Sequence, residues 1–382
     1  MRSDDEATEK KALKHMFDSA LVDELARLLR AADRRFDAGT FVARAKPGLE
    51  GLEMIARAGQ IADALHAALP RPTSAALAAL TRSLPLPADG AAGVVAQGYR
   101  FWPYGEYILR YGLPDVDGSF AAMIALTQCF SSEFAIRPFL AADLAGSLAR
   151  LTKLLDHPNQ HVRRWVSEGT RSRLPWAKKV PALTQAVDER LKLLSALRHD
   201  PERYVQRSVA NHLQDILKDD PVRGKRALAS WVREGHPGLT WICKHAARGL
   251  LKAGDPEVLA LFGYAPTGIT FEVASLQASP KRLDLGERVT LSATIVAAGR
   301  AKQAAPARVD FALVSPTKTG KRARKVFRLT EARLRPGDSL DVEKAYAFVH
   351  RSIRRVIAGE HTFELLVNGA IAASASVRVS VT

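Results

Sequence analysis

The sequence predicts a multidomain protein of the α plus β class, an all-α solenoid of helical repeats followed by an immunoglobulin-like β-sandwich. Three observations lead to this prediction. Apolar residues recur at three- and four-residue spacing from about Lys10 to Tyr264, and they alternate with polar residues after Tyr264. Two similar segments, Leu155–Arg171 and Leu197–Asp215, also lie inside the helical part. We therefore expect a helical domain over 1–264 and a sandwich over 265–382.

The helical part shows the apolar spacing of amphipathic helices. Leu21 and Leu25 fall on one helix face, and Leu191 and Leu194 fall on another. Proline and glycine separate these apolar runs, and Asp220 followed by proline is typical of a helix start. The pattern predicts a series of short helices.

The two similar segments share an order of residues, in which a turn with proline is followed by valine and then by arginine on a helix. Val162 aligns with Val205, and a weaker third copy places Trp241 at the corresponding position. Two-helix units with a period of about 40 residues are typical of HEAT-like repeats, which bury their apolar faces by stacking on one another. A run of unrelated helices is the alternative, but the shared order favours repeats.

The C-terminal part alternates in short runs that glycines separate. Seven short strands in a segment of this length are typical of an immunoglobulin-like sandwich. The predicted strands cover residues 269–273, 288–296, 308–313, 324–329, 340–348, 360–367 and 373–381.

The net charge favours a polyanionic partner. The 382 residues include 56 Lys and Arg against 40 Asp and Glu, a net charge of +16, and 47% are hydrophobic. A basic folded chain favours nucleic acid or an anionic membrane, and a basic surface with no partner is the alternative. Cys129 and Cys243 lie in apolar helical contexts without zinc-site spacing, which indicates core residues.

The N-terminus is charged and has no signal peptide, and no apolar run reaches the roughly 18 residues of a membrane span. We therefore expect a cytoplasmic protein of bacterial type, associated with the nucleoid.

Basic residues recur on one face of three successive predicted helices, which would place them along one surface of a stacked repeat. Such a surface suits the closely spaced phosphates of duplex DNA. The alternative is a solvated face with intrahelical ion pairs, each worth a few tenths of a kcal/mol. The face positions are Arg164, Glu168 and Arg171, then Arg207, Asn211 and Asp215, then Lys244 and Arg248.

The acids among these positions need a separate reason, because Glu168 and Asp215 would repel DNA. Cleavage of a nucleotide's glycosidic bond develops oxocarbenium character on the sugar. A carboxylate about 4 Å from the sugar cation, at an effective dielectric constant near 20, contributes about 4 kcal/mol of Coulomb attraction. That corresponds to roughly three orders of magnitude in rate. The alternative is that each acid only pairs with a neighbouring arginine.

Three runs of the chain resemble the HEAT-like-repeat alkylpurine DNA glycosylases of the AlkC type. They are Ser131–Phe139, Arg164–Trp176 and Val205–Ile216, and the Arg-Leu-Pro-Trp ending of the second is the most specific. Residues before about Tyr99 contain no matching run. Some members of this family carry a C-terminal immunoglobulin-like domain, in agreement with the predicted strands.

The resemblance implies a monofunctional glycosylase of base excision repair that hydrolyses the N-glycosidic bond of cationic N3-methylated bases in duplex DNA. The implied substrates are 3-methyladenine and 3-methylcytosine, removed without a base-flipping pocket. Glu133, Glu168 and Asp215 match the family's catalytic acids, and Trp176 matches its aromatic residue at the lesion. A methylated base is already cationic and leaves readily, so the carboxylates need only stabilise the sugar cation and position water.

A second basic region lies in the predicted sandwich, where the segment between Lys318 and Arg335 contains a single acid, Glu331. We interpret this segment as a second contact to the DNA backbone. The residues predicted to bind DNA are Arg164, Arg171, Arg173, Lys178, Arg207, Asn211, Lys244 and Arg248 in the helical part and Lys321, Arg322 and Arg324 in the sandwich.

Two other functions remain open from the residues alone. A non-catalytic DNA-binding or damage-sensing repeat protein would use the acids only structurally, and a scaffold for acidic proteins would not prefer duplex DNA. No metal constellation, phosphate loop or Schiff-base lysine stands out. We expect a monomer that needs no cofactor or metal and has no lyase step.

Overall fold

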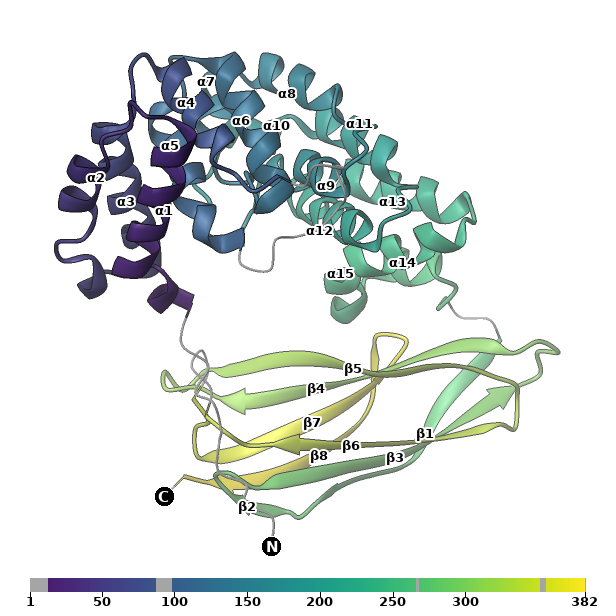
Figure 1. Cartoon of the computed structure of the whole chain (residues 1–382). Helices are drawn as coiled ribbons and strands as arrows, with labels where there is room; N and C mark the ends of the chain where they lie inside the picture. The colour runs from purple at the N-terminus through teal and green to yellow at the C-terminus, as the bar shows by residue number, and fades with distance from the viewer. Residues whose placement is uncertain (1–12, 87–97, 266–267, 351–354, 382) are drawn as a thin grey trace, which may run out of the picture. The chain divides into compact units, whose positions relative to one another are not determined.

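The computed structural model describes residues 13–86, 98–265, 268–350 and 355–381. Helices occupy the described part of the chain as far as Leu261, and strands begin at Ile269 (Figure 1), which confirms the predicted fold class. The first eight α-helices are α1 (Ser19–Ala32), α2 (Ala38–Ala45), α3 (Met54–Ala68), α4 (Thr73–Arg82), α5 (Trp102–Tyr111), α6 (Val116–Cys129), α7 (Arg137–Ala142) and α8 (Leu144–Thr152).

The similar segments form the second helix of successive pairs, since α9 follows α8 and α12 follows α11. Polar caps begin several of these helices; the Asn159 side chain, for example, accepts a hydrogen bond from the backbone N–H of His161 at the start of α9. The remaining α-helices are α9 (Gln160–Gly169), α10 (Pro181–Gln185), α11 (Val187–Leu197), α12 (Arg203–Asp219), α13 (Pro221–Arg233), α14 (Pro237–Ala246), α15 (Arg248–Ala253) and α16 (Pro256–Leu261).

Two sheets follow, with strand orders β1-β3-β6 and β2-β8-β7-β4-β5. All seven predicted strands are present. The additional strand β2 has only three residues and pairs in parallel with β8, so it is too short to show alternation in the sequence. The strands are β1 (Ile269–Ser279), β2 (Arg282–Asp284), β3 (Arg288–Gly299), β4 (Ala305–Pro316), β5 (Arg322–Leu334), β6 (Ser339–Ala347), β7 (Gly359–Val367) and β8 (Ala370–Ser380).

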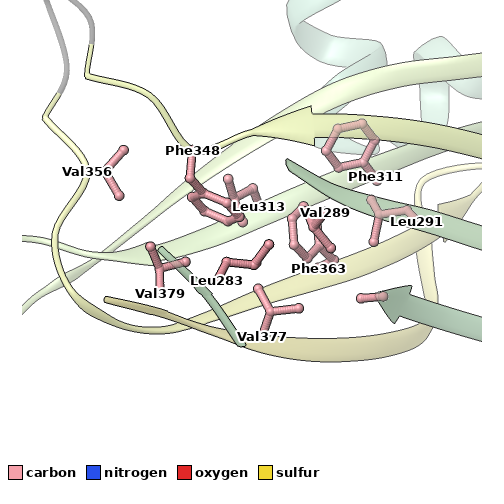
Figure 2. Packing of buried hydrophobic residues seen from close by; sticks show 11 residues of the cluster. Leu283, Val289, Leu291, Phe311, Leu313, Phe348, Val356, Phe363, Val377 and Val379 are labelled. Atoms are coloured by element: carbon pink, nitrogen blue, oxygen red, sulfur yellow. The ribbon is translucent and has the colours of Figure 1, made fainter. Parts of the chain in front are cut away.

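The core of the sandwich forms where inward-facing positions of both sheets meet. Figure 2 shows Leu291 on β3 close to Phe311 on β4 and Phe363 on β7, and the same cluster includes Val377 on β8. Phe311 stacks on Phe327 of β5 with a ring-centroid distance of 4.9 Å. The apolar residues that alternate along the sequence therefore point into this core, and the polar residues between them point to the outer faces.

The chain divides into two compact units, residues 1–227 and 228–382, so the last helices belong with the sandwich. Arg308 and Asp310 on β4 do not face the core formed by Phe311, yet both are buried and joined by an ion pair of 2.7 Å. Helix α15 contacts the neighbouring strand β5. The change from helix to strand near residue 264 thus lies inside the second unit.

The two cysteines are buried free thiols, as predicted for core residues. Burial raises the pKa of Cys129 to about 11 and that of Cys243 to about 12, so neither is a ready nucleophile. Among the described helices, none has both the length and the apolar character needed to cross a membrane.

Candidate active site

Helices α9 and α12 pack against each other in the first unit and carry the candidate acids. Val162 on α9 and Val205 on α12 are fully buried, so the two aligned positions belong to the core, as does Trp165 on α9. Residues three apart share a helix face, and Glu168 follows the buried Trp165 by three positions as Asp215 follows the buried His212. This packing therefore fixes the direction of Glu168 and Asp215. The two similar segments therefore position the site between their own helices.

Five charged side chains form an alternating row, which we call the acid–arginine chain: Glu133, Arg164, Glu168, Arg171 and Asp215. Arg164 Nη1 lies 2.6 Å from Glu133 Oε2, and Arg164 Nη2 lies 3.7 Å from Glu168 Oε2. Arg171 Nη1 donates to Glu168 Oε1 at 2.6 Å, and its Nε donates to Asp215 Oδ2 at 2.9 Å. The three acids predicted from the sequence are thus brought together.

Burial increases along the chain. The side chain of Glu133 is 17% exposed, that of Glu168 is 8% and that of Asp215 is 3%. Buried charges are retained where they are paired and hydrogen-bonded. Three carboxylates face two guanidinium groups, so the chain keeps one negative charge in excess.

Serine hydroxyls complete the bonding of two carboxylates. Ser208 Oγ donates to Glu168 Oε2 at 2.6 Å, and Ser131 Oγ donates to Glu133 Oε2 at 2.8 Å. Both oxygens of Glu168 consequently have donors, one from Arg171 and one from Ser208. This bonding holds the Glu168 carboxylate in one orientation.

The arginines of the chain are held in their charged form. Burial opposes the charge on Arg164, but Glu133 and Glu168 raise its pKa above the ordinary value. Burial likewise opposes the charge on Arg171, and the hydrogen bond to Asp215 together with the charge of Glu168 raises its pKa. Both side chains therefore remain cationic counterions.

This placement departs from the predicted phosphate contacts of Arg164 and Arg171. Their guanidinium groups are largely shielded from solvent and engaged with acids, because helices α9 and α12 pack face to face. Their ion pairs hold the three carboxylates in place. Spacing on a single helix could not show this, since the partners Glu133 and Asp215 come from other parts of the chain.

Trp176 stands on the loop after α9. It is 71% exposed and adopts a left-handed backbone conformation, with φ of 66°. The buried Arg137 anchors this loop, because its Nε donates to Lys178 O at 3.0 Å and its Nη1 donates to Gly169 O and Arg171 O. Sequence reasoning missed Arg137, whose acceptors are carbonyls that no pattern marks.

The other predicted DNA-binding residues of the first unit lie nearer the surface. Lys178 and Arg207 are exposed, and Asn211 is half-buried. Arg173 is half-exposed and its Nε lies 2.8 Å from Asp219 Oδ1. Asp219 also binds the buried Arg190 at 3.0 Å, an ion pair that sequence reasoning did not single out.

Lys244 and Arg248 occupy a different position from the one predicted, because they lie in the second unit beside the sandwich. Lys244 Nζ lies 2.7 Å from Glu331 Oε2 on β5 and 3.1 Å from the Tyr264 hydroxyl. Lys244 thus ties helix α14 to the sheet. Arg248 donates to His245 O at 2.5 Å and borders a small cavity that Glu331 also lines.

The three predicted basic residues of the sandwich are exposed. Lys321 and Arg322 lie at the start of β5, and Arg324 follows. Arg324 Nε binds Glu364 Oε2 at 2.8 Å, and Arg322 donates to the Glu360 carbonyl at 3.3 Å. Their charges remain accessible along the edge strand of the larger sheet.

Comparisons with known proteins agree with this architecture. Residues 272–381 match a family model described as "Uncharacterised protein YhaZ, C-terminal Ig-like domain". The chain is 32% identical over 362 residues to the uncharacterized protein YhaZ of Bacillus subtilis (strain 168), which covers 94% of this chain and 97% of that protein. It is also similar to a solved structure of the Pseudomonas fluorescens alkylpurine DNA glycosylase AlkC, bound to DNA containing an abasic site analog. The two sequences are 32% identical, the match covers 97% of this chain and 99% of the solved one, and the TM-score is 0.88.

A helical unit followed by an immunoglobulin-like sandwich is thus the architecture of a DNA glycosylase. The chain belongs to the AlkC family of alkylpurine DNA glycosylases.

Proposed function

We propose that the protein is a monofunctional DNA glycosylase that hydrolyses the N-glycosidic bond of cationic N3-methylated bases in duplex DNA. The substrates we assign are 3-methyladenine and 3-methylcytosine. One observation carries the proposal: three carboxylates share an acid–arginine chain with excess negative charge. The chain lies in a protein whose sequence is 32% identical to that of an alkylpurine DNA glycosylase of similar fold.

In the proposed reaction the bond between C1′ and the base breaks, and its electron pair goes to the base. The base carries a positive charge before cleavage, so it leaves as a neutral molecule. The positive charge then develops on the sugar, where nearby carboxylates stabilise it. Water adds to C1′ and gives its proton to a carboxylate. No base protonation is required, which suits a site that has carboxylates and bound arginines.

The acid–arginine chain supplies a fixed electric field for this step. Arg164 and Arg171 hold the carboxylates of Glu168 and Asp215 in place before the reaction, so little reorganisation is needed as charge develops. Glu133 has the most exposed carboxylate of the three, which makes it the group best placed to accept a proton from water. Glu168 and Asp215 act through their charge.

DNA is the proposed partner, and Trp176 is the residue we assign to the lesion. Its exposed aromatic side chain can stack on a base or wedge into the duplex. Phosphate contacts are assigned to accessible basic or polar side chains rather than to the buried arginines: Arg173, Lys178, Arg207, Asn211, Lys321, Arg322 and Arg324.

Replacing Asp215 by asparagine tests the catalytic assignment. The substitution keeps the shape but removes the negative excess of the chain, so we expect release of 3-methyladenine to fall by at least about a hundredfold. The measurement is single-turnover release of bases from methylated duplex DNA, separated by chromatography. Asp188→Asn, at a largely exposed position on α11, is the matched control.

DNA binding should persist in Asp215→Asn, because the substitution removes a charge that repels phosphate. A variant that releases bases at the wild-type rate would contradict the catalytic assignment. It would favour the alternative of a damage-sensing protein whose acids are structural.

The double substitution Lys321→Ala with Arg322→Ala tests the basic segment of the sandwich. Each phosphate contact contributes about 0.9 to the slope of log K against log salt, so we expect the slope to fall by up to about 1.8. Fluorescence anisotropy with duplex DNA at several salt concentrations measures it. Lys302→Ala combined with Arg300→Ala, which removes the same charge from the β3–β4 loop, is the control. Equal slopes in the two variants would remove this segment from the DNA interface.

A further inference from the structure

A cavity of about 230 Å³ lies inside the second unit, where helices α14 and α15 meet strands β4 and β5. Basic side chains line it from both the helices and the strands, and among the described residues one acid, Glu331, lines it with them. The basic side chains are Lys244, Arg248 and Lys252 on the helices and Arg308 and Arg328 on the strands. The cavity is therefore strongly basic.

The carboxylates that pair with these cations do not balance their charge. Glu331 is shared, since it lies 2.7 Å from Lys244 Nζ and 3.3 Å from Arg328 Nη2. Arg308, whose side chain is 5% exposed, is held by Asp310 at 2.7 Å. Even with Arg248 set aside, four cations face these two carboxylates, which leaves two positive charges in excess.

The cations of the helices and of the strands lie close enough to repel one another. Burial raises the pKa of the Asp310 carboxyl, and the hydrogen bond from Arg308 opposes that rise. The charges of Lys252 and Arg328 oppose it as well, so both cations lie within electrostatic range of the same buried group. An anion between Lys252 on α15 and Arg328 on β5 relieves their repulsion and holds the helix to the sheet.

The chemistry of the cavity walls favours a phosphate group. Arginine offers a planar fork of donors that matches phosphate oxygens, and lysine adds a point charge. The excess of two positive charges matches a terminal phosphate, which carries about −1.5 to −2 at pH 7. Trp241 also lines the cavity, and its indole gives an apolar surface for the organic part of a phosphate ester. A terminal phosphate can enter a recess from one side, whereas a phosphate inside a DNA strand carries a sugar on each side.

We infer that this cavity binds the terminal phosphate of a phosphate monoester. A free mononucleotide and the 5′ end of a DNA strand both carry this group. The inference does not depend on the proposed glycosylase activity, because the cavity lies in the second unit, outside the acid–arginine chain, and its tests measure binding alone.

The test is calorimetric titration of deoxyadenosine monophosphate into the full-length protein at constant ionic strength. We expect saturable binding, and at least about tenfold weaker binding of deoxyadenosine, which lacks the charged group. Equal affinity for the two probes, or no saturable binding of the nucleotide, would overturn the inference. Acetate at the same concentration should not displace the nucleotide. Displacement would identify a carboxylate site and reject the phosphate assignment.

Two substitutions that remove one charge each locate the site. Lys252→Gln and Arg328→Gln should each weaken nucleotide binding by at least about tenfold, because each removes a charged donor. Lys344→Gln and Arg288→Gln are the matched controls, since both residues are exposed on the smaller sheet, and they should leave binding unchanged. Unchanged binding in both cavity variants, with folding verified by circular dichroism, would place the phosphate elsewhere.

Glu331→Gln tests the same cavity in the opposite direction. Glu331 competes with the phosphate for Lys244 and Arg328, and the substitution releases both from it. We therefore expect nucleotide binding to tighten by at least about fivefold. The free protein should melt at a lower temperature, and the nucleotide should restore it. A lower melting temperature without any gain in affinity would show that these ion pairs are purely structural and would contradict the inference.

Two short duplexes, one with a 5′-phosphate and one with a 5′-hydroxyl, separate the two sources of the phosphate. Each is added to the protein with deoxyadenosine monophosphate bound. Displacement by the phosphorylated duplex alone assigns the end of a DNA strand, and retention of the nucleotide with both duplexes assigns a free nucleotide. Either result supports a site for a terminal phosphate. Equal displacement by both duplexes would show that internal phosphates occupy the cavity and would reject the inference.

Discussion

Glu168→Gln should reduce the rate of 3-methyladenine release by about three orders of magnitude. A carboxylate about 4 Å from the sugar contributes about 4 kcal/mol at an effective dielectric constant near 20, and that energy corresponds to roughly a thousandfold in rate. The substitution removes the excess negative charge of the acid–arginine chain. In the wild type, Arg171 and Ser208 donate to different oxygens of Glu168. The glutamine amide has one oxygen, so its NH₂ group would face one of these two donors.

Single-turnover kinetics with methylated duplex DNA measure this effect, and anisotropy with undamaged duplex measures binding. Glu24→Gln is a suitable control, because Glu24 also pairs with an arginine, Arg100, but lies outside the acid–arginine chain. We expect binding to be unchanged or tighter in Glu168→Gln, since one repulsive charge is removed. Less than a tenfold loss of base release would show that Glu168 is structural.

Arg171→Met should destabilise the protein by about 3–5 kcal/mol, the usual effect of removing one partner of a buried ion pair. Arg171 supplies both hydrogen bonds that the Asp215 carboxylate receives within the described residues, and it also binds Glu168. Methionine fills similar space but leaves the buried Asp215 without a counterion and Glu168 with Arg164 alone. The repulsion between these acids should also reduce base release, because it disturbs the positions of the carboxylates.

Urea unfolding followed by circular dichroism gives the free energy of unfolding. Arg207→Met is the matched control, because Arg207 is exposed on α12, and it should change stability by less than about 0.5 kcal/mol. Adding Asp215→Asn to Arg171→Met should restore part of the lost stability, since it removes one unpaired charge. A stable Arg171→Met with no such rescue would contradict the description of Arg171 as the buried counterion.

The sequence is sufficient for the order of helices and strands because the apolar period changes from about 3.6 to 2 residues near residue 264. It also places Glu168 and Asp215 on helices that turn out to face each other. The repeat supports this, since Val162 and Val205 are both buried at aligned positions. Local periodicity was enough wherever the determining contacts lie within one helix or strand.

Periodicity along the chain could not predict contacts between segments that are far apart in the sequence. The bond from Ser208 to Glu168 and the anchoring of the Trp176 loop by Arg137 join residues far apart in the chain. The same limit explains Arg164, which looks like a phosphate ligand on an isolated helix and is a counterion once Glu133 folds beside it. Spacing identifies a shared helix face but does not identify what packs against that face.

The left-handed backbone at Trp176 implies that the stability of the fold and the proposed contact with DNA favour different residues at this position. A residue with a side chain costs about 1–2 kcal/mol in this conformation, and glycine largely avoids that cost. Selection for a robust fold would therefore favour glycine at this position, whereas the proposed contact with damaged DNA requires the indole ring. The proposed contact with damaged DNA would account for a tryptophan that is both exposed and strained at this position.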